Sequence, residues 1–153
     1  MPAGGNYLAL AGFIMLSFLA PLASVGIDPR DWYSTLLKPV WSPPGWLFGP
    51  VWALLYVSMG VAAWGIWNRR GWSGSLALWL MQLGLNAAWT PVFFGLHRPD
   101  LAFAVIAILW VAILATLFSF RKIEPWCGWI LVPYFAWVTF ASALNFSIWH
   151  LNR

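Results

Sequence analysis

Long apolar runs separated by short polar segments dominate the pattern of this chain. A helix needs about 20 consecutive apolar residues to cross the hydrocarbon core of a membrane. Five runs meet that length without a single charged side chain, and they cover residues 6–26, 46–67, 74–95, 101–120 and 127–149. The pattern predicts an all-α membrane protein in which residues 1–153 form one five-helix transmembrane bundle.

The polar segments between the runs predict how the helices are joined. Three of them are short, NRRGWS, HRPD and RKIEPW, so neighbouring helices should run antiparallel. The first connection, IDPRDWYSTLLKPVWSPP, is much longer. Within it, Asp28–Pro29 is a typical helix start, and the prolines after DWYSTLL end the helix and keep the chain extended. We expect a short interfacial helix here, in an ordered cap over the bundle.

Two properties of the first run and the loops bear on topology. The first run contains LAPLAS, which resembles a signal-peptide cleavage region, but no Lys or Arg precedes it, so a retained helix is favoured. The Lys and Arg residues divide evenly between the two sides of the predicted bundle, so the positive-inside rule leaves the orientation open. No internal repeat is visible, which argues against an inverted-repeat transporter.

The composition supports a membrane protein and narrows its function. The chain is 62% hydrophobic and 8% charged, whereas a soluble domain carries about a quarter charged residues. The net charge of +4 is scattered, so nucleic-acid binding has no support. The single cysteine, Cys127, excludes an intramolecular disulfide. Most of the fourteen tryptophans lie near span ends, as in membrane-interface belts. Five lie deeper and need another explanation: Trp52, Trp79, Trp89, Trp110 and Trp137.

The third run, which ends in QLGLNAAWTPVFFG, predicts a helix with two different faces. At 100° per residue, one face groups amides and aromatic rings within about 60°: Gln82, Asn86, Trp89 and Phe93. The opposite face is small and flat: Gly84, Ala88, Pro91 and Gly95. The amide face should point into the bundle because unpaired amides in hydrocarbon cost several kcal/mol. The small face is a candidate helix–helix or dimer contact, and Pro91 is expected to kink or shape the helix.

The deep polar and aromatic side chains allow two interpretations. Singly, each amide is explained by an interhelical hydrogen bond and each aromatic ring by core packing. Together, three helices that each present a tryptophan and a polar group predict a flat, aromatic-lined cavity for a hydrophobic planar ligand, in which the ligand or water satisfies Asn86 and Gln82. The predicted ligand-binding residues are Trp52, Tyr56, Gln82, Asn86, Trp89, Phe93, Tyr134, Trp137, Ala141, Leu144 and Asn145.

Conventional catalysis finds little support among these residues. No Asp, Glu or His lies inside a predicted span, so there is no embedded acid, base, proton relay or cation site. His97, His150 and Cys127 lie near span ends without metal-ligand spacing. We therefore predict no metal site and no required cofactor.

Three motifs in order resemble the tryptophan-rich sensory protein / translocator protein family. They are WSPPGWLFGPVWALLY, QLGLNAAWTPVFFG and VPYFAWVTFASALN, and the similarity runs from the Asp-Trp-Tyr of the first loop to the C-terminus. The chain looks like a bacterial member, which implies a bacterial cell membrane. The resemblance implies a five-helix bundle, usually dimeric, that binds porphyrins such as protoporphyrin IX, with links to tetrapyrrole transport and stress sensing. Some bacterial members break down protoporphyrin in light.

The resemblance also implies roles for individual residues. By motif, the pocket tryptophans are Trp52, Trp89 and Trp137, and other pocket positions match Asn86, Ala141 and Leu144. Trp52 and Trp137 match the pair implicated in porphyrin breakdown. Animal members also bind cholesterol and benzodiazepine-site drugs. Here Phe146 replaces the tyrosine of their cholesterol motif and Leu101 replaces a tryptophan after the third loop, so neither ligand is expected to carry over.

We therefore expect a porphyrin ring stacked between the three pocket tryptophans, with its propionates neutralised near the first loop by Arg30, Lys38 or Arg98. Light-driven breakdown would use Trp52 and Trp137 as redox partners, so the sequence leaves open whether the protein is an enzyme. The alternatives are a non-catalytic sensor or scaffold, and a carrier of porphyrin, sterol-like or other hydrophobic ligands.

Overall fold

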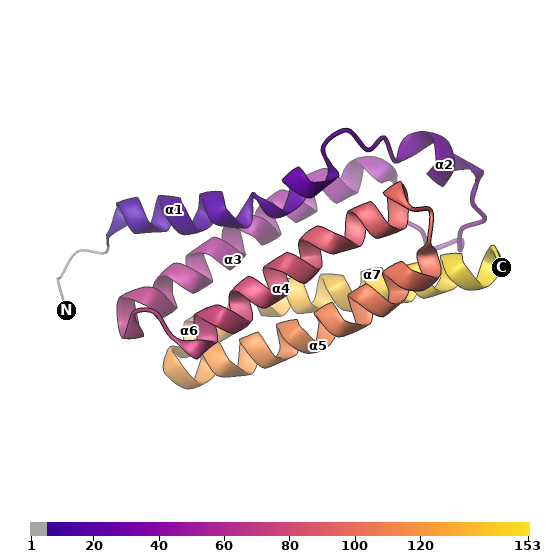
Figure 1. The fold of residues 1–153 in the computed structure, drawn as a ribbon. Coiled ribbons are helices and arrows are strands. Elements are labelled where there is room, and N and C mark those ends of the chain that lie inside the picture. The colour runs from indigo at the N-terminus through magenta and orange to yellow at the C-terminus, as the bar shows by residue number, and fades with distance from the viewer. Residues whose placement is uncertain (1–5) are drawn as a thin grey trace.

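A computed structural model describes residues 6–153, which contain helices and loops but no strand (Figure 1). The elements are α1 Tyr7–Ser17, η1 Ala20–Ser24, α2 Arg30–Thr35, η2 Gly45–Leu47, α3 Phe48–Arg70, α4 Gly74–Thr90, η3 Pro91–Gly95, α5 Pro99–Ile123, α6 Pro125–Trp129 and α7 Val132–Leu151. Five helical segments are long and apolar enough to cross a membrane: Tyr7–Ser24, Gly45–Arg70, Gly74–Gly95, Pro99–Ile123 and Pro125–Leu151. The predicted all-α five-helix membrane bundle is confirmed.

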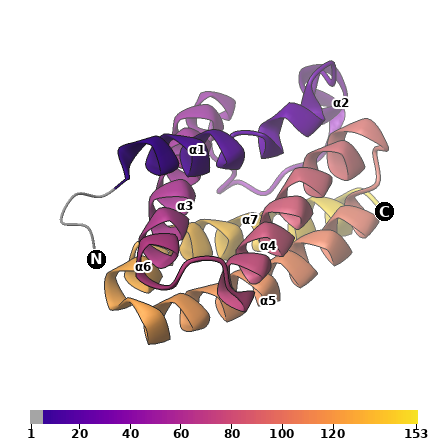
Figure 2. The same ribbon diagram turned by 60° about the vertical axis from the view of Figure 1, so that its left-hand side comes forward.

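The long helices lie side by side and alternate in direction (Figures 1 and 2). α4 and α7 both pack along α5, and α1 packs along α3. A close approach between α1 and α3 depends on Gly60, because a Cβ there would lie 2.6 Å from the backbone of Ile14. Phe13, also in α1, contacts the rings of Trp67 in α3 and Trp79 in α4. The first span thus packs along α3 and contacts Trp79 of α4 from the outside of the bundle, with only 11% of its residues buried.

Prolines mark the places where three of the spans are interrupted. The first span changes from α1 to the 3₁₀ turn η1 at Pro21, and the last is divided into α6 and α7 just before Pro133. The third changes at Pro91 from α4 into the π-helical turn η3, in which the amide of Leu96 bonds to the Pro91 carbonyl at 2.9 Å. Proline lacks the N–H that would continue the α-helical pattern. The predicted distortion at Pro91 is therefore a widened turn, a feature often found at functional sites.

The long first loop is an ordered cap over one end of the bundle, as predicted. Its helix, α2, begins directly after Pro29, and the Asp28 carboxylate accepts the Arg30 amide at 3.0 Å. The Asn152 side chain accepts the Leu37 amide at 2.9 Å and donates to the Leu37 carbonyl at 2.8 Å. These two bonds tie the loop to the end of α7, which lies at the same end of the molecule (Figure 1).

A second contact holds the cap to the turn between η3 and α5. Trp32 of α2 stacks on His97 with ring centres 4.5 Å apart and meets Phe93 edge-on. His97 has a positive φ of 54° at the turn between η3 and α5. The cap therefore spans the bundle end from the α4–α5 turn to the C-terminal helix.

Candidate ligand site

Four buried polar side chains from α3, α4 and α7 form one hydrogen-bond network in the middle of the bundle. The Tyr56 hydroxyl donates to Asn86 Oδ1 at 2.6 Å, and Asn86 Nδ2 donates to the Tyr134 hydroxyl at 3.0 Å. Tyr134 in turn donates to Gln82 Oε1 at 2.7 Å. The Gln82 amide points toward the sulfur of Met59, 3.8 Å away. No member of this network is more than 7% exposed.

The network bears on the two interpretations of the amides. Interhelical hydrogen bonds are confirmed for Asn86 and Gln82, so neither amide depends on a ligand or water for a partner, and their contact with a ligand stays a prediction. The physical reason is that Tyr56 and Tyr134, expected to act mainly as aromatic walls, also bring hydroxyl groups to the interior. A sequence signal was available, because a phenol placed in hydrocarbon needs a partner as much as an amide does.

The three pocket tryptophans lie about one helical turn from this network, all on the side of the first-loop cap. α3 runs away from the cap, and Trp52 precedes Tyr56 by four residues. α4 and α7 run toward the cap, and Trp89 and Trp137 follow Asn86 and Tyr134 by three residues. Three residues of α-helix rise about 4.5 Å. The three tryptophans therefore lie at one level along their helices, here called the indole layer, between the polar network and the cap.

Trp52 and Trp89 each have firm partners inside the bundle. Trp52 stacks on Tyr56 with ring centres 5.6 Å apart and meets Tyr134 edge-on at 6.3 Å. Trp89 donates its indole N–H to Asn145 Oδ1 at 2.9 Å and stacks on Phe93 at 5.0 Å. Contacts of these two rings thus connect six of the predicted residues in two groups, Trp52 with Tyr56 and Tyr134, and Trp89 with Phe93 and Asn145.

The remaining predicted residues of α7 are divided between two parts of the core. Leu144 is buried in a small cluster below the cap, together with Phe93, Ala102 and Ile148. Asn145 Nδ2 donates to the Pro99 carbonyl at 2.8 Å and so joins α7 to the start of α5. Ala141 packs against the main core. These residues surround the cap end of the bundle, next to Trp89.

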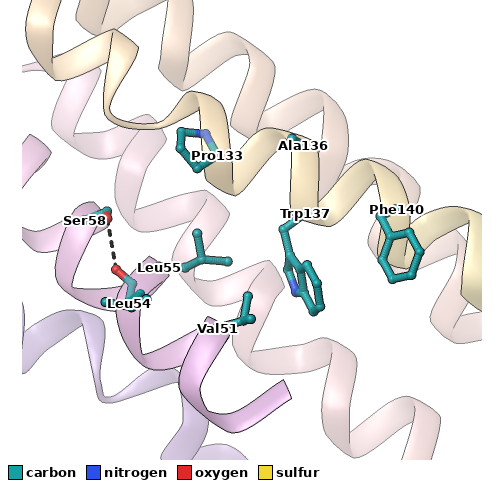
Figure 3. Close-up of a pocket in the computed structure, with 8 residues that line it drawn as sticks. All are labelled: Val51, Leu54, Leu55, Ser58, Pro133, Ala136, Trp137 and Phe140. Atoms are coloured by element: carbon teal, nitrogen blue, oxygen red, sulfur yellow. Dashed lines mark hydrogen bonds between the residues drawn. The ribbon is translucent and has the colours of Figure 1, made fainter. Parts of the chain in front are cut away.

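Trp137 occupies a different position, in the wall of a groove between α3 and α7 (Figure 3). The groove has a volume of about 520 Å³ and is lined by Val51, Leu54, Leu55, Ser58, Pro133, Ala136, Trp137 and Phe140. Figure 3 shows Val51 and Leu55 projecting from α3 toward the indole. Trp52 and Trp89 do not line this groove. A single ligand held by all three indoles stays a prediction.

The three loop cations differ in how they are engaged. Arg30 and Arg98 pair with carboxylates two residues away, Asp28 at 3.1 Å and Asp100 at 2.6 Å. The hydrogen bonds from Arg30 lower the pKa of Asp28. Lys38 has no carboxylate partner among residues 6–153; it donates to the Leu36 carbonyl and lies 4.6 Å above the Tyr33 ring.

The site is therefore uncharged in its interior, and its rim carries cations that are paired with carboxylates except for Lys38. Within residues 6–153, no three His, Cys, Asp or Glu side chains lie close enough together to hold a metal ion. The chemistry that the interior offers is ring stacking, hydrogen bonding by neutral groups and electron donation by indoles.

These features define the protein as an integral multi-pass membrane protein of five helices, with a neutral polar network at mid-membrane overlaid by tryptophans.

Comparison with known proteins gives the family. The TspO/MBR family model matches residues 8–150, and the chain belongs to this family. The tryptophan-rich sensory protein of Cereibacter sphaeroides is 40% identical over 144 residues, 91% of each chain. Protein CrtK of Rhodobacter capsulatus is 43% identical over 130 residues, 82% of this chain and 81% of its own. Human translocator protein is 36% identical over 127 residues, 80% of this chain and 75% of its own.

Proposed function

We propose that this protein binds protoporphyrin IX or a related tetrapyrrole inside the membrane of a bacterial cell and serves in porphyrin transport, regulation or stress sensing. The observation that carries the proposal is the indole layer, in which Trp52, Trp89 and Trp137 come from three separate helices at one level of the bundle. Flat faces of indole rings suit a flat aromatic ligand. Relatives named as a tryptophan-rich sensory protein and as translocator proteins support a role in sensing or transport.

The bound porphyrin would be oriented by the difference between the two sides of the indole layer. The network side presents amides and phenols that are already paired. The cap side presents cations, of which Lys38 has no competing carboxylate. Propionates would therefore lie toward the cap, where an ammonium or guanidinium group forms a charge-assisted hydrogen bond. Arg30 and Arg98 would have to exchange their present carboxylate partners to do the same.

Light-driven breakdown of the bound porphyrin is the chemical part of the proposal, and it requires no acid or base. A light-excited porphyrin takes one electron from an adjacent indole, which leaves a porphyrin radical anion and an indole radical cation. Trp52 and Trp137 are the proposed donors. Trp52 stacks on Tyr56, so its ring is held in a fixed position beside the network.

Titration of the purified protein with protoporphyrin IX in the dark, followed by illumination, tests both parts. We expect saturable quenching of tryptophan fluorescence and then loss of porphyrin absorbance in light. The double variant Trp52→Phe/Trp137→Phe keeps aromatic packing but removes the easily oxidised rings, so binding should survive and breakdown should fall. Trp110→Phe, whose indole instead bonds to Thr139, is the matched control. Absent binding refutes the proposal, and undiminished breakdown in the double variant refutes the redox role alone.

A sensor without chemistry is the second candidate, and the cap favours it. The cap touches both the α4–α5 turn, through Trp32 and His97, and the C-terminal helix, through Leu37 and Asn152. A ligand in the indole layer would move the cap, and a protein partner that binds the cap would recognise the change. Ligand-dependent hydrogen exchange of the Leu37 amide, without flux of porphyrin into liposomes, would support the sensor. Measurable flux would support a carrier instead.

A homodimer through the small face of α4 is part of the proposal. Gly84 and Ala88 are exposed, and a Cβ added at Gly84 would meet no atom within 4 Å. A second copy could therefore approach this helix closely. Ala88→Phe should convert a dimer to a monomer in detergent, as measured by light scattering, while Val111→Phe on the exposed side of α5 should not. A dimer that persists in Ala88→Phe would rule out this face.

A further inference from the structure

The groove between α3 and α7 lies at the depth of the membrane centre. On α3 its lining runs from Val51 to Ser58, within the span Gly45–Arg70. On α7 it runs from Pro133 to Phe140, within the span Pro125–Leu151. Trp137 is 12 residues from one end of its span and 14 from the other. The groove therefore faces hydrocarbon and not the aqueous phase on either side.

The groove is also next to the indole layer. Its lining residues Val51 and Leu55 directly precede Trp52 and Tyr56, which face the interior. Trp137 belongs to both, because it lines the groove and is one of the three indoles of the layer. The backbones of α3 and α7 are not closely packed against each other, so side chains, among them Trp137 and Leu55, separate the groove from the indole layer.

One polar atom in the groove wall has no partner. Trp137 Nε1 is buried, and no acceptor among residues 6–153 takes its hydrogen. By contrast, the indoles of Trp89 and Trp110 both donate to polar side chains. Ser58, on the opposite wall, uses its hydroxyl hydrogen on the Leu54 carbonyl and keeps its oxygen lone pairs free (Figure 3). The apolar groove at mid-membrane thus has one acceptor, Ser58, and in its wall one unpaired donor, Trp137 Nε1, which becomes accessible only when the indole moves.

We propose that this groove is the entrance through which the ligand passes from the bilayer into the indole layer. The molecule it suits is flat, dissolved in hydrocarbon and equipped with a carbonyl or protonated carboxyl oxygen that accepts from Trp137. On the aqueous side the cap lies over the end of the bundle and is held there through Trp32 and Leu37. The identity of the ligand as a porphyrin rests on the function proposed above, whereas the route rests on the groove.

An entrance has a kinetic signature that separates it from a binding site. A side chain that narrows the passage raises the barrier for both directions, so association and dissociation slow by the same factor and the equilibrium affinity stays unchanged. A side chain that removes ligand contacts in the resting complex weakens affinity, mostly through faster dissociation.

Narrowing the groove from each wall tests the route. Ser58→Phe acts from α3 and Ala136→Phe acts from α7, so a folding defect in one leaves the other informative. Val111→Phe adds the same ring to the exposed side of α5, away from the groove. Each protein is reconstituted in liposomes, and protoporphyrin IX is mixed in by stopped flow. Tryptophan quenching gives the association rate, and a chase with protein-free vesicles gives the dissociation rate.

We expect both groove variants to slow association and dissociation by about tenfold, with dissociation constants within about twofold of the unchanged protein and of Val111→Phe. Unchanged rates in both groove variants, with normal binding by the unchanged protein, would overturn the entrance and leave the proposed function standing. Weaker affinity with unchanged association would also overturn it. Absence of porphyrin binding by the unchanged protein would overturn the proposed function, and this route for porphyrin with it.

Discussion

The polar groups in the membrane interior and those at its loop end are paired in opposite ways. In the interior, neutral phenols and amides bond across 30 to 52 positions of sequence and join α3, α4 and α7. At the loop end, Arg30 and Arg98 bond to carboxylates only two residues away. In hydrocarbon an unpaired polar group is costly, so each interior bond restrains where helices lie. At the surface water competes for the same hydrogen bonds, so exposed ion pairs contribute little to the stability of the fold.

α4 repeats this contrast on its own two faces. Gln82 and Asn86 are 1% and 6% exposed and are engaged in the network, whereas Gly84 and Ala88 on the other side contact no other part of the chain closely. One face therefore fixes the fold of the protomer, and the other is left for lipid or a second copy. If this distinction is right, substitutions in the interior and at the loop end should differ in the size of their effect on stability and in its dependence on pH. They should also differ in whether they affect global unfolding or only local opening.

Asn86→Leu should have the largest effect on stability. It removes the acceptor of the Tyr56 hydroxyl and a donor to Tyr134 at once, while it keeps the side-chain volume. Interhelical hydrogen bonds in membranes average about 0.6 kcal/mol and reach about 1.7 kcal/mol, so we expect a loss of about 1–3 kcal/mol in the free energy of unfolding. Unfolding by SDS in mixed micelles, followed by circular dichroism, measures it.

The control for that measurement is Ser58→Ala. Its hydroxyl bonds only to the Leu54 carbonyl of its own helix, which keeps its α-helical partner. The loss should be below about 0.5 kcal/mol, as for substitutions away from buried networks. Equal losses in Asn86→Leu and Ser58→Ala would show that the network does not restrain the bundle.

The two tyrosine hydroxyls sharpen the comparison within the network. Tyr134 takes part in two hydrogen bonds and is 1% exposed, whereas Tyr56 makes one and lies closer to the edge of the core at 7%. Tyr134→Phe should therefore cost about 1–2 kcal/mol and Tyr56→Phe about 0.6 kcal/mol in the same SDS assay. The reverse order would mean that Tyr134 is stabilised by ring packing and not by its hydroxyl.

Asn152→Ala tests a bond pair that is distant in sequence yet exposed to water. It removes both hydrogen bonds to Leu37, a residue 115 positions away. We expect a change below about 0.5 kcal/mol in global unfolding but about fivefold faster hydrogen exchange at the Leu37 amide, because the cap opens locally. Trp32→Phe, which weakens the other anchor of the cap, should leave that amide protected. Unchanged exchange in Asn152→Ala would mean that the cap is held without this contact.

How far the sequence predicts these regions depends on whether each feature is local. The five spans follow from the length of apolar runs, because membrane thickness sets that length, and the observed span Gly74–Gly95 coincides with the predicted one. The two faces of α4 follow from helical periodicity. The short helix of the cap follows from Asp28–Pro29, although the helix begins one residue later, at Arg30.

The partners of the deep residues depend on three helices at once and could not be predicted in the same way. Tyr134 and Trp137 are both predicted to face the ligand. At 100° per residue, however, two residues three positions apart point in directions that differ by about 60°. That rotation is enough for Tyr134 to enter the network while Trp137 lines a groove on the outside. Pro91 predicts a distortion but not its type, since a π-turn depends on what the freed carbonyls and neighbouring rings contact.

The smallest effect should come from the ion pair between Arg30 and Asp28, and its dependence on pH separates the two regions most directly. Hydrogen bonds from Arg30 lower the pKa of Asp28 below its usual value of 3.8. A carboxylate with a lowered pKa stabilises the folded state above its unfolded pKa, and this contribution is lost as the pH falls below about 4. Both side chains are exposed, so Asp28→Asn should change the SDS unfolding midpoint at pH 7 less than any substitution above, and salt should remove what difference there is. The loss in Asn86→Leu should be the same at pH 7 and pH 3 and at any salt concentration, because amides and phenols do not change charge in that range. A loss in Asp28→Asn as large as that in Asn86→Leu would mean that the loop charges hold the bundle together as strongly as the interior network does.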